Sequence, residues 1–252
     1  MEAVPLAILG LAAFLTSILS AVIGLAGGMT LLAVMLLFLD PLVAIPLHGA
    51  VQLVSNGSRA WFQRAHVERE ILWRYFPLLV PGGLAGLLVV QQLAPELLRV
   101  LIGAFVLVAT WAPQWLLLGV HPEQSDPHRR FVWLGGAIGF LNMSIGATGP
   151  LSAPFFLSLG LSRQALVGTQ AACQAVGHLV KIALFAAAGF AFASWLEPLA
   201  LLAAAVVAGT WVGTQLLDRV SERVFVPLFK TVLTLIALRL LALEVATALG
   251  LH

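Results

Sequence analysis

The chain has 252 residues, of which 61% are hydrophobic and 10% are charged, and its formal net charge is +2. Ordinary soluble domains carry about 25% charged residues, so this composition excludes a soluble protein and predicts an all-α integral membrane protein with several spans. The small net charge argues against a nucleic-acid-binding surface. The single cysteine excludes an internal disulfide framework and a multi-cysteine metal site.

Eight segments have about the length that a membrane-spanning helix needs, roughly 20 apolar residues. The first of them lacks a basic n-region and a cleavage signal, so we expect a membrane helix there and not a removed signal peptide. The fifth is slightly short. In chain order the segments are 4–23, 42–62, 72–92, 97–118, 131–145, 164–188, 195–217 and 225–249.

Two further apolar segments, 28–39 and 150–160, are too short to cross a membrane comfortably alone. Each follows a glycine-rich break, so we expect half-helices that begin inside the membrane or re-entrant segments. If both cross, every basic loop falls on one side, which is the bias of cytoplasmic loops. We therefore favour ten segments with both termini outside; eight spans with two re-entrant segments are the alternative. The basic loop residues are Arg64, Arg69, Arg74, Arg129, Arg130, Arg163, Arg219 and Arg223.

The sequence repeats itself at an offset of 122 residues without a gap. "IGLAGG" at 23–28 aligns with "IGATGP" at 145–150, Gln52 with Gln174, and Arg59 with Lys181. Matching polar residues inside apolar segments are hard to explain by chance, so we infer a duplication.

Each half of the duplication holds five segments, and because five is odd the second half must enter the membrane upside down. The sequence therefore predicts two inverted repeats, 1–118 and 131–252, joined by a cytoplasmic linker at 119–130. Secondary transporters built in this way bind their substrates near the midplane between the halves.

Polar residues form a stripe on two of the apolar segments, because their spacing follows the turn of an α-helix. An ionisable group inside a bilayer is costly and usually faces the bundle interior or a wet cavity. We therefore expect the two stripes to meet at the centre. The first stripe is His48, Gln52, Ser55, Asn56 and Arg59, and the second is Gln170, Gln174, His178 and Lys181.

A plain structural explanation stands beside each of these residues. Arg59 lies close to a basic loop and could extend to the membrane surface, whereas Lys181 lies deeper between apolar residues. The two histidines could be neutral residues that hydrogen-bond across helices, and the two glutamines could join helices in the same way.

The glycine-rich breaks predict anion contacts. A helix that begins after a break presents free N–H groups and the positive end of its dipole, and glycine lets a ligand approach the backbone closely. Close helix packing is the competing explanation, but the polar stripes that accompany both breaks favour a ligand. The glycines concerned are Gly24, Gly27, Gly28, Gly146 and Gly149.

No Asp or Glu lies well inside a segment, so the interior suits an anionic substrate and not a cation. Histidine is the side chain able to carry a proton near neutral pH, and His48 and His178 are the candidates for proton coupling. We predict no catalytic residue, cofactor or metal. The predicted substrate-binding residues are Gly27, Gly28, Gln52, Asn56, Arg59, Gly149, Gln174, His178 and Lys181.

Two motifs carry a resemblance to a known family. "VIGLAGGMTLL" and "SIGATGPLSAPFFLSLGLSRQALVGTQAA" resemble the first-half and second-half signatures of the sulfite exporter TauE/SafE family of bacterial membrane permeases. The resemblance covers essentially the whole chain, although Leu25 and Ala26 interrupt the fuller glycine run of the family. It implies a permease for sulfite, sulfonates or related small anions.

The first functional hypothesis is therefore a secondary transporter of a small sulfur-containing anion that works by alternating access. An anion channel is the alternative. An integral-membrane enzyme is disfavoured, because the sequence holds no H-E-x-x-H motif, no cysteine cluster and no acid to orient a histidine. The expected location is the bacterial inner membrane. The expected partners are a small anion and the lipid bilayer, without nucleic acid, and a homo-oligomer is compatible with this hypothesis.

Overall fold

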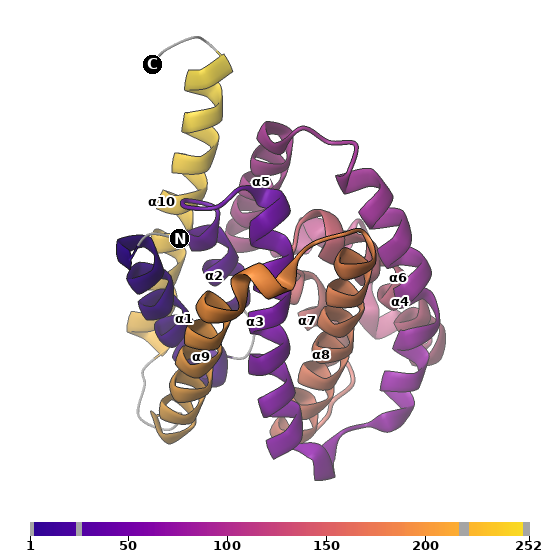
Figure 1. Cartoon of the computed structure of the whole chain (residues 1–252). Coiled ribbons are helices and arrows are strands. Elements are labelled where there is room, and N and C mark those ends of the chain that lie inside the picture. Colours follow the sequence, from indigo (N-terminus) through magenta and orange to yellow (C-terminus); the bar gives the residue numbers. More distant parts are fainter. Residues whose placement is uncertain (1–2, 24–26, 217–221, 249–252) are drawn as a thin grey trace.

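The computed structural model describes residues 3–23, 27–216 and 222–248, and within these ranges the chain forms α-helices and short 3-10 turns but no strand (Figure 1). This confirms the all-α prediction. The helices are α1 (Ala3–Ile23), α2 (Gly27–Met35), α3 (Pro41–Phe62), α4 (Arg69–Val90), α5 (Pro95–Trp111), α6 (Pro127–Ser144), α7 (Gly149–Leu157), α8 (Arg163–Ala187), α9 (Leu196–Leu216) and α10 (Glu222–Ala248). The 3-10 turns are η1 (Arg64–His66), η2 (Pro113–Leu117), η3 (Pro122–Gln124) and η4 (Phe192–Trp195).

Local capping explains where the two polar helices begin. The Asp40 side chain accepts a hydrogen bond of 2.9 Å from the Leu42 N–H, and Pro41 occupies the first helical position of α3. Ser162 caps α8 in the same way through the Ala165 N–H. Both arrangements are strong helix-start signals, so each polar stripe begins at a fixed point.

Among the predicted boundaries that the structure shifts, two have a clear local cause. The span 97–118 ends early, because Pro113 cannot continue a helix; α5 stops at Trp111, and the segment 113–124 turns away from it by 113°. The span 131–145 begins early, because Asp126 caps a helix that has Pro127 at its first position. Part of the expected linker at 119–130 is therefore helix.

The helices pack in pairs that follow the 122-residue offset. Adding 122 to the bounds of α2 gives those of α7, and the same shift carries α1 to α6 and α4 to α9. In space α1 packs on α9, and α4 packs on α6. These two pairs are equivalent, because α6 is the counterpart of α1 and α9 is the counterpart of α4. Figure 1 shows these two pairs flanking a central pair, α3 and α8.

The central pair is antiparallel. The start of α8 lies against the end of α3, where Gly168 approaches Gln63, and further along Lys181 packs beside Gly49. Since α3 and α8 occupy equivalent places in the two halves, a two-fold axis that exchanges them runs across the helices and not along them. This is the packing that an inverted repeat requires; the opposite insertion of the two halves into a membrane stays a prediction.

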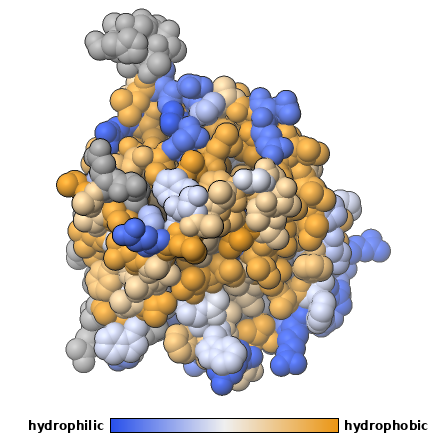
Figure 2. Space-filling view, viewed as in Figure 1, coloured by the Kyte–Doolittle hydropathy of each residue, from blue (hydrophilic) through white to orange (hydrophobic). Residues whose placement is uncertain are grey.

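The outer surface has the composition of a membrane protein. Figure 2 shows that hydrophobic residues cover most of the visible face, with hydrophilic ones mainly towards its upper and lower ends. By length and composition, four helices of the described chain can cross a membrane, or five if α5 and the segment bent away from it form one span. Helix α3 is also long enough, but its polar stripe lowers its hydropathy.

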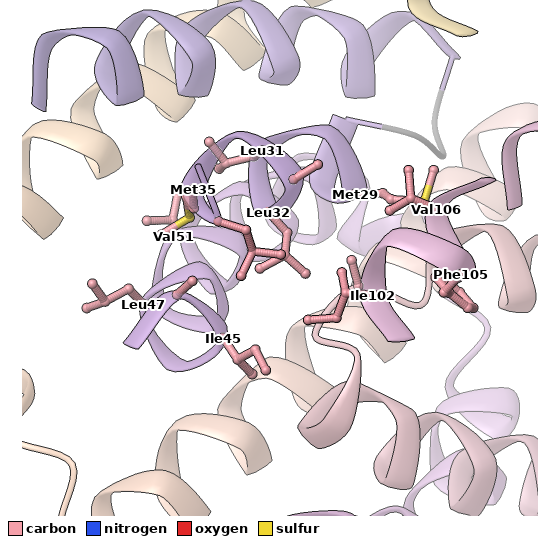
Figure 3. Close-up of a cluster of buried hydrophobic side chains, with 14 of the residues drawn as sticks. Met29, Leu31, Leu32, Met35, Ile45, Leu47, Val51, Ile102, Phe105 and Val106 are labelled. Carbon is pink, nitrogen blue, oxygen red and sulfur yellow. The ribbon is translucent and has the colours of Figure 1, made fainter. Parts of the chain in front are cut away.

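Helices α2 and α7 have nine residues each, about 14 Å at 1.5 Å per residue, so neither alone crosses the roughly 30 Å hydrocarbon layer. Protein surrounds α2: Met29, Leu31 and Leu32 are buried among side chains from α3 and α5 (Figure 3). Short helices are tolerated at membrane depth when protein covers them. Whether α2 and α7 complete a crossing stays a prediction.

The second break requires glycine at one position. Gly146 has a φ of 86°, and a Cβ there would lie 2.8 Å from the Leu32 side chain. Gly160 also has a positive φ, 64°, but open space around its Cα. We expect Gly160→Ala to lower the free energy of unfolding by about 1 kcal/mol, the usual cost of a left-handed backbone. Gly146→Ala should cost about 2–4 kcal/mol, because overpacking adds to that cost.

Thermal unfolding in detergent compares the two variants under identical conditions. Equal melting temperatures would contradict the view that Leu32 closes tightly on the second break.

Candidate functional site

A cavity lies where the middle of α3 meets the middle of α8, beside the starts of α2 and α7. It offers about 30 Å³ to the centres of water molecules, and one water needs about 10–15 Å³ by this measure. The space therefore fits about two waters or one compact ion. The polar side chains around it are Ser20, His48, Gln52, Arg59, Tyr75, Asn142, Thr148, Gln174 and His178.

The first stripe forms a hydrogen-bonded chain that ends at the cavity. Asn56 donates to the Gln52 side-chain oxygen at 3.5 Å and accepts a bond from the Arg59 guanidinium. Arg59 also donates to the Ser20 carbonyl at 3.3 Å. Arg59 is held by this tether and is only 8% exposed, so it does not extend to the membrane surface. Asn56 itself is outside the cavity lining and positions its two neighbours.

The two histidines meet edge to face at the cavity, with their ring centres 5.9 Å apart. His48 Nε2 lies 2.8 Å from the Gly28 carbonyl, and since a carbonyl only accepts, this nitrogen donates. The neutral ring then leaves Nδ1 as an acceptor, and the Nδ1 atoms of both histidines are buried without a partner among the described residues. His178 is the freer of the two, because within the described chain no hydrogen bond holds its ring.

Lys181 lies behind the cavity and not in its lining. Its side chain is fully buried, and its ammonium donates a bond of 2.7 Å to the Gly146 carbonyl at the second break. Gly49 makes room for it, since a Cβ there would lie 2.6 Å from the lysine stem. Arg59 holds the equivalent place in the first half, where it bonds the Ser20 carbonyl. Each repeat thus uses one cation to bind a carbonyl where a helix ends.

The predicted glycines separate into two groups. Gly28 and Gly149 line the cavity. Gly27 does not; a Cβ on Gly27 would lie 2.0 Å from the Thr16 carbonyl, so it permits close packing on α1. Gly24 lies outside the described residues. Helix α7 begins at Gly149, so the N–H groups of its first turn have no partner within the helix.

Four polar lining residues, Ser20, Tyr75, Asn142 and Thr148, were not among the predicted binding or proton-coupling residues. Tyr75 reaches the cavity from α4, Asn142 from α6 and Ser20 from α1. The Asn142 side-chain oxygen is buried without a partner in the described chain. Asn142 stands just before the second glycine break, a signal that could have found it, and Tyr75 is the one tyrosine of the sequence.

A family model described as "Sulfite exporter TauE/SafE" matches residues 9–240. The chain belongs to the sulfite exporter TauE/SafE family. Comparison with curated proteins and with solved structures gives no match. Membership of a family of membrane transport proteins agrees with the apolar surface, so this TauE/SafE protein is embedded in a membrane.

Acidic side chains of this TauE/SafE protein lie away from the cavity. Arg99 of α5 pairs with Glu244 of α10 at 3.2 Å and with Asp40, which caps the start of α3, at 3.6 Å. No Asp or Glu is among the described residues that line the cavity. Within the described chain no three His, Cys, Asp or Glu side chains could together hold a metal ion. The site is therefore polar, positively charged and free of acidic residues within these ranges.

Proposed function

We propose that this protein is a secondary transporter for a compact sulfur-containing anion such as sulfite. The observation that carries the proposal is a cation pair without an acid: Arg59 lines the cavity and Lys181 lies behind it, while the described lining has no carboxylate. Buried charge is costly unless it is compensated. An anion in the cavity supplies the missing charge.

The donors around the cavity suit a pyramidal oxyanion. Gln52 and Gln174 reach it from the two central helices, and Gly149 brings one backbone N–H from the start of α7. Sulfite presents three oxygens that accept hydrogen bonds, so several neutral donors can share it with Arg59. Amide donors hold an anion less strongly than a cluster of cations, which favours release.

The size of the cavity supports the smaller members of the substrate class. A volume of about 30 Å³ for water centres leaves no room for the carbon chain of an organosulfonate. We therefore propose sulfite or another compact oxyanion, bound with both ends of the pathway closed. In this proposal one repeat rocks against the other around the site, which opens the site to each side of the membrane in turn.

Counterflow of labelled sulfite in proteoliposomes tests this function. A carrier loaded with unlabelled sulfite should accumulate external label transiently, whereas a channel equilibrates the label without an overshoot. Taurine and chloride serve as competing solutes that should reduce the overshoot far less. Absence of any saturable sulfite flux, in protein whose folding is confirmed by its melting transition, would contradict the proposed substrate.

A pH gradient added to the same assay tests proton coupling through the histidine pair. If a proton moves with the anion, an inward proton gradient should drive net uptake, and His178→Gln should remove that drive while leaving exchange. His48→Gln serves as the comparison, because the Nε2 of His48 is held by the Gly28 carbonyl. If the pH gradient leaves uptake unchanged in the unsubstituted protein and in both histidine variants, proton coupling is contradicted and anion exchange is the energy source.

A further inference from the structure

A second hollow lies at the end of the molecule that carries the basic loops. It sits between the last turn of α3 and the first turn of α8, and it offers about 340 Å³ to water centres. We call it the vestibule. Gln63, Arg163 and Gln164 are among the residues that line it.

The vestibule attracts anions by its position. It receives the N-terminus of α8, the positive end of that helix dipole, and Arg163 stands at the first helical position. An anion that leaves the bulk solution therefore gains favourable potential here before it reaches the central cavity.

Arg59 separates the vestibule from the central cavity. It is the one described residue that lines both spaces. Its guanidinium is held by the Ser20 carbonyl and Asn56, yet its Nε is buried without a partner among the described residues. A single side chain, whose guanidinium tip is hydrogen-bonded and whose Nε has no partner, thus borders both the cavity and the vestibule.

On the Lys181 side of the central cavity the arrangement differs. The equivalent cation, Lys181, is fully buried and lines neither space. His48 and His178 lie in front of it, against the cavity. Of the two equivalent cations, therefore, only Arg59 borders the cavity.

We propose that Arg59 is a gate on the loop side of the transport pathway, which an anion opens by drawing the guanidinium away from its tether. The partially satisfied guanidinium then accompanies the anion between vestibule and cavity. This proposal rests on the proposed function for the nature of the solute, but the barrier itself is a property of the structure that can be tested without transport.

Cysteine accessibility provides the test. Cys173 is the one cysteine of the chain and is buried in an apolar cluster, so Cys173→Ala gives a cysteine-free background. Ala147→Cys then places a thiol in the cavity lining, and Gln164→Cys places one in the vestibule. The probe is iodoacetate, a compact anionic thiol reagent with a single methylene group, added separately to inside-out and right-side-out membrane vesicles.

With Arg59 present, the vestibule thiol should react quickly from the loop face and the cavity thiol slowly. Arg59→Ala should raise the rate at the cavity thiol at least 10-fold from the loop face, without changing the rate from the other face. Arg59→Gln keeps a polar side chain and should give a smaller rise in the labelling rate. It serves as the second variant in case Arg59→Ala folds poorly. Ser58→Ala is the matched control, because Ser58 is the neighbour of Arg59 and lines neither space.

An unchanged cavity rate in both Arg59 variants would overturn the gate, as would an increase seen only from the opposite face. Failure of the sulfite assay has a separate meaning: faster labelling without sulfite flux supports the gate and rejects the proposed substrate. Sulfite flux with an unchanged labelling rate supports the proposed substrate and rejects the gate.

Discussion

Replacing Gln52 and Gln174 together by alanine is expected to abolish sulfite counterflow and to weaken sulfite binding more than 100-fold. These amides reach the cavity from α3 and α8, and each is a donor from one repeat. A hydrogen bond to a charged group contributes about 1.5–3 kcal/mol, so two of them amount to about 3–6 kcal/mol. Because 1.4 kcal/mol is a factor of ten, the loss exceeds two orders of magnitude.

The measurement is the sulfite-dependent rise in melting temperature together with counterflow. A matched control is the double change of Gln91 and Gln92 to alanine, since both are exposed at the end of α4. It should leave binding and flux unaltered. Counterflow at the normal rate in the Gln52→Ala/Gln174→Ala protein would rule out the proposed donors, and loss of the melting transition itself would point to folding instead.

Helical spacing in the sequence predicted much of the site. His48, Gln52 and Arg59 fall on one face of an α-helix, and a stripe of that kind must turn inward in a bilayer. The 122-residue offset then indicated that a second stripe would face the first. Both inferences depend on local periodicity, which the chain expresses within single helices, and α3 and α8 do meet along these faces.

Helix docking could not be predicted in the same way. Gly27 and Gly28 are adjacent and equally suited to a ligand, yet only Gly28 lines the cavity, since α1 approaches the other. The side on which α1 packs is set by tertiary contacts and leaves no local signal. Tyr75 was missed for this reason too, because its role depends on how α4 packs against the centre.

Partners at a distance also decided the orientation of the two cations. Arg59 could have extended to the surface from its place near a loop, but the Ser20 carbonyl, far away in sequence, holds it inside. Lys181 was expected to supply positive potential from slightly further away than the direct ligands, and its ammonium binds the Gly146 carbonyl behind the cavity. Carbonyls at helix ends carry partial negative charge, which explains why buried cations are tolerated there without an acid.

Lys181→Met is expected to produce a folded protein that no longer binds sulfite well. The ammonium is fully buried and donates its hydrogen bond to the neutral Gly146 carbonyl. Replacing it by an apolar side chain of similar length need not destabilise the fold and can raise stability. The anion, by contrast, loses a positive charge close behind its site. For two unit charges taken as about 8 Å apart at an effective dielectric constant of about 20, the attraction is about 2 kcal/mol, or roughly 30-fold in affinity.

Stability and sulfite binding should change in different directions in Lys181→Met. The melting temperature without sulfite should stay equal or rise, while the shift produced by sulfite should shrink strongly. Lys230→Met is the matched control, because Lys230 packs over the Trp111 ring, away from the cavity lining, and it should retain normal binding. If Lys181→Met instead unfolds the protein but binds sulfite normally when stabilised, Lys181 serves only to secure the second break. The charge that attracts the anion then comes from Arg59 alone, and Arg59→Met in the same assay should show the 30-fold loss.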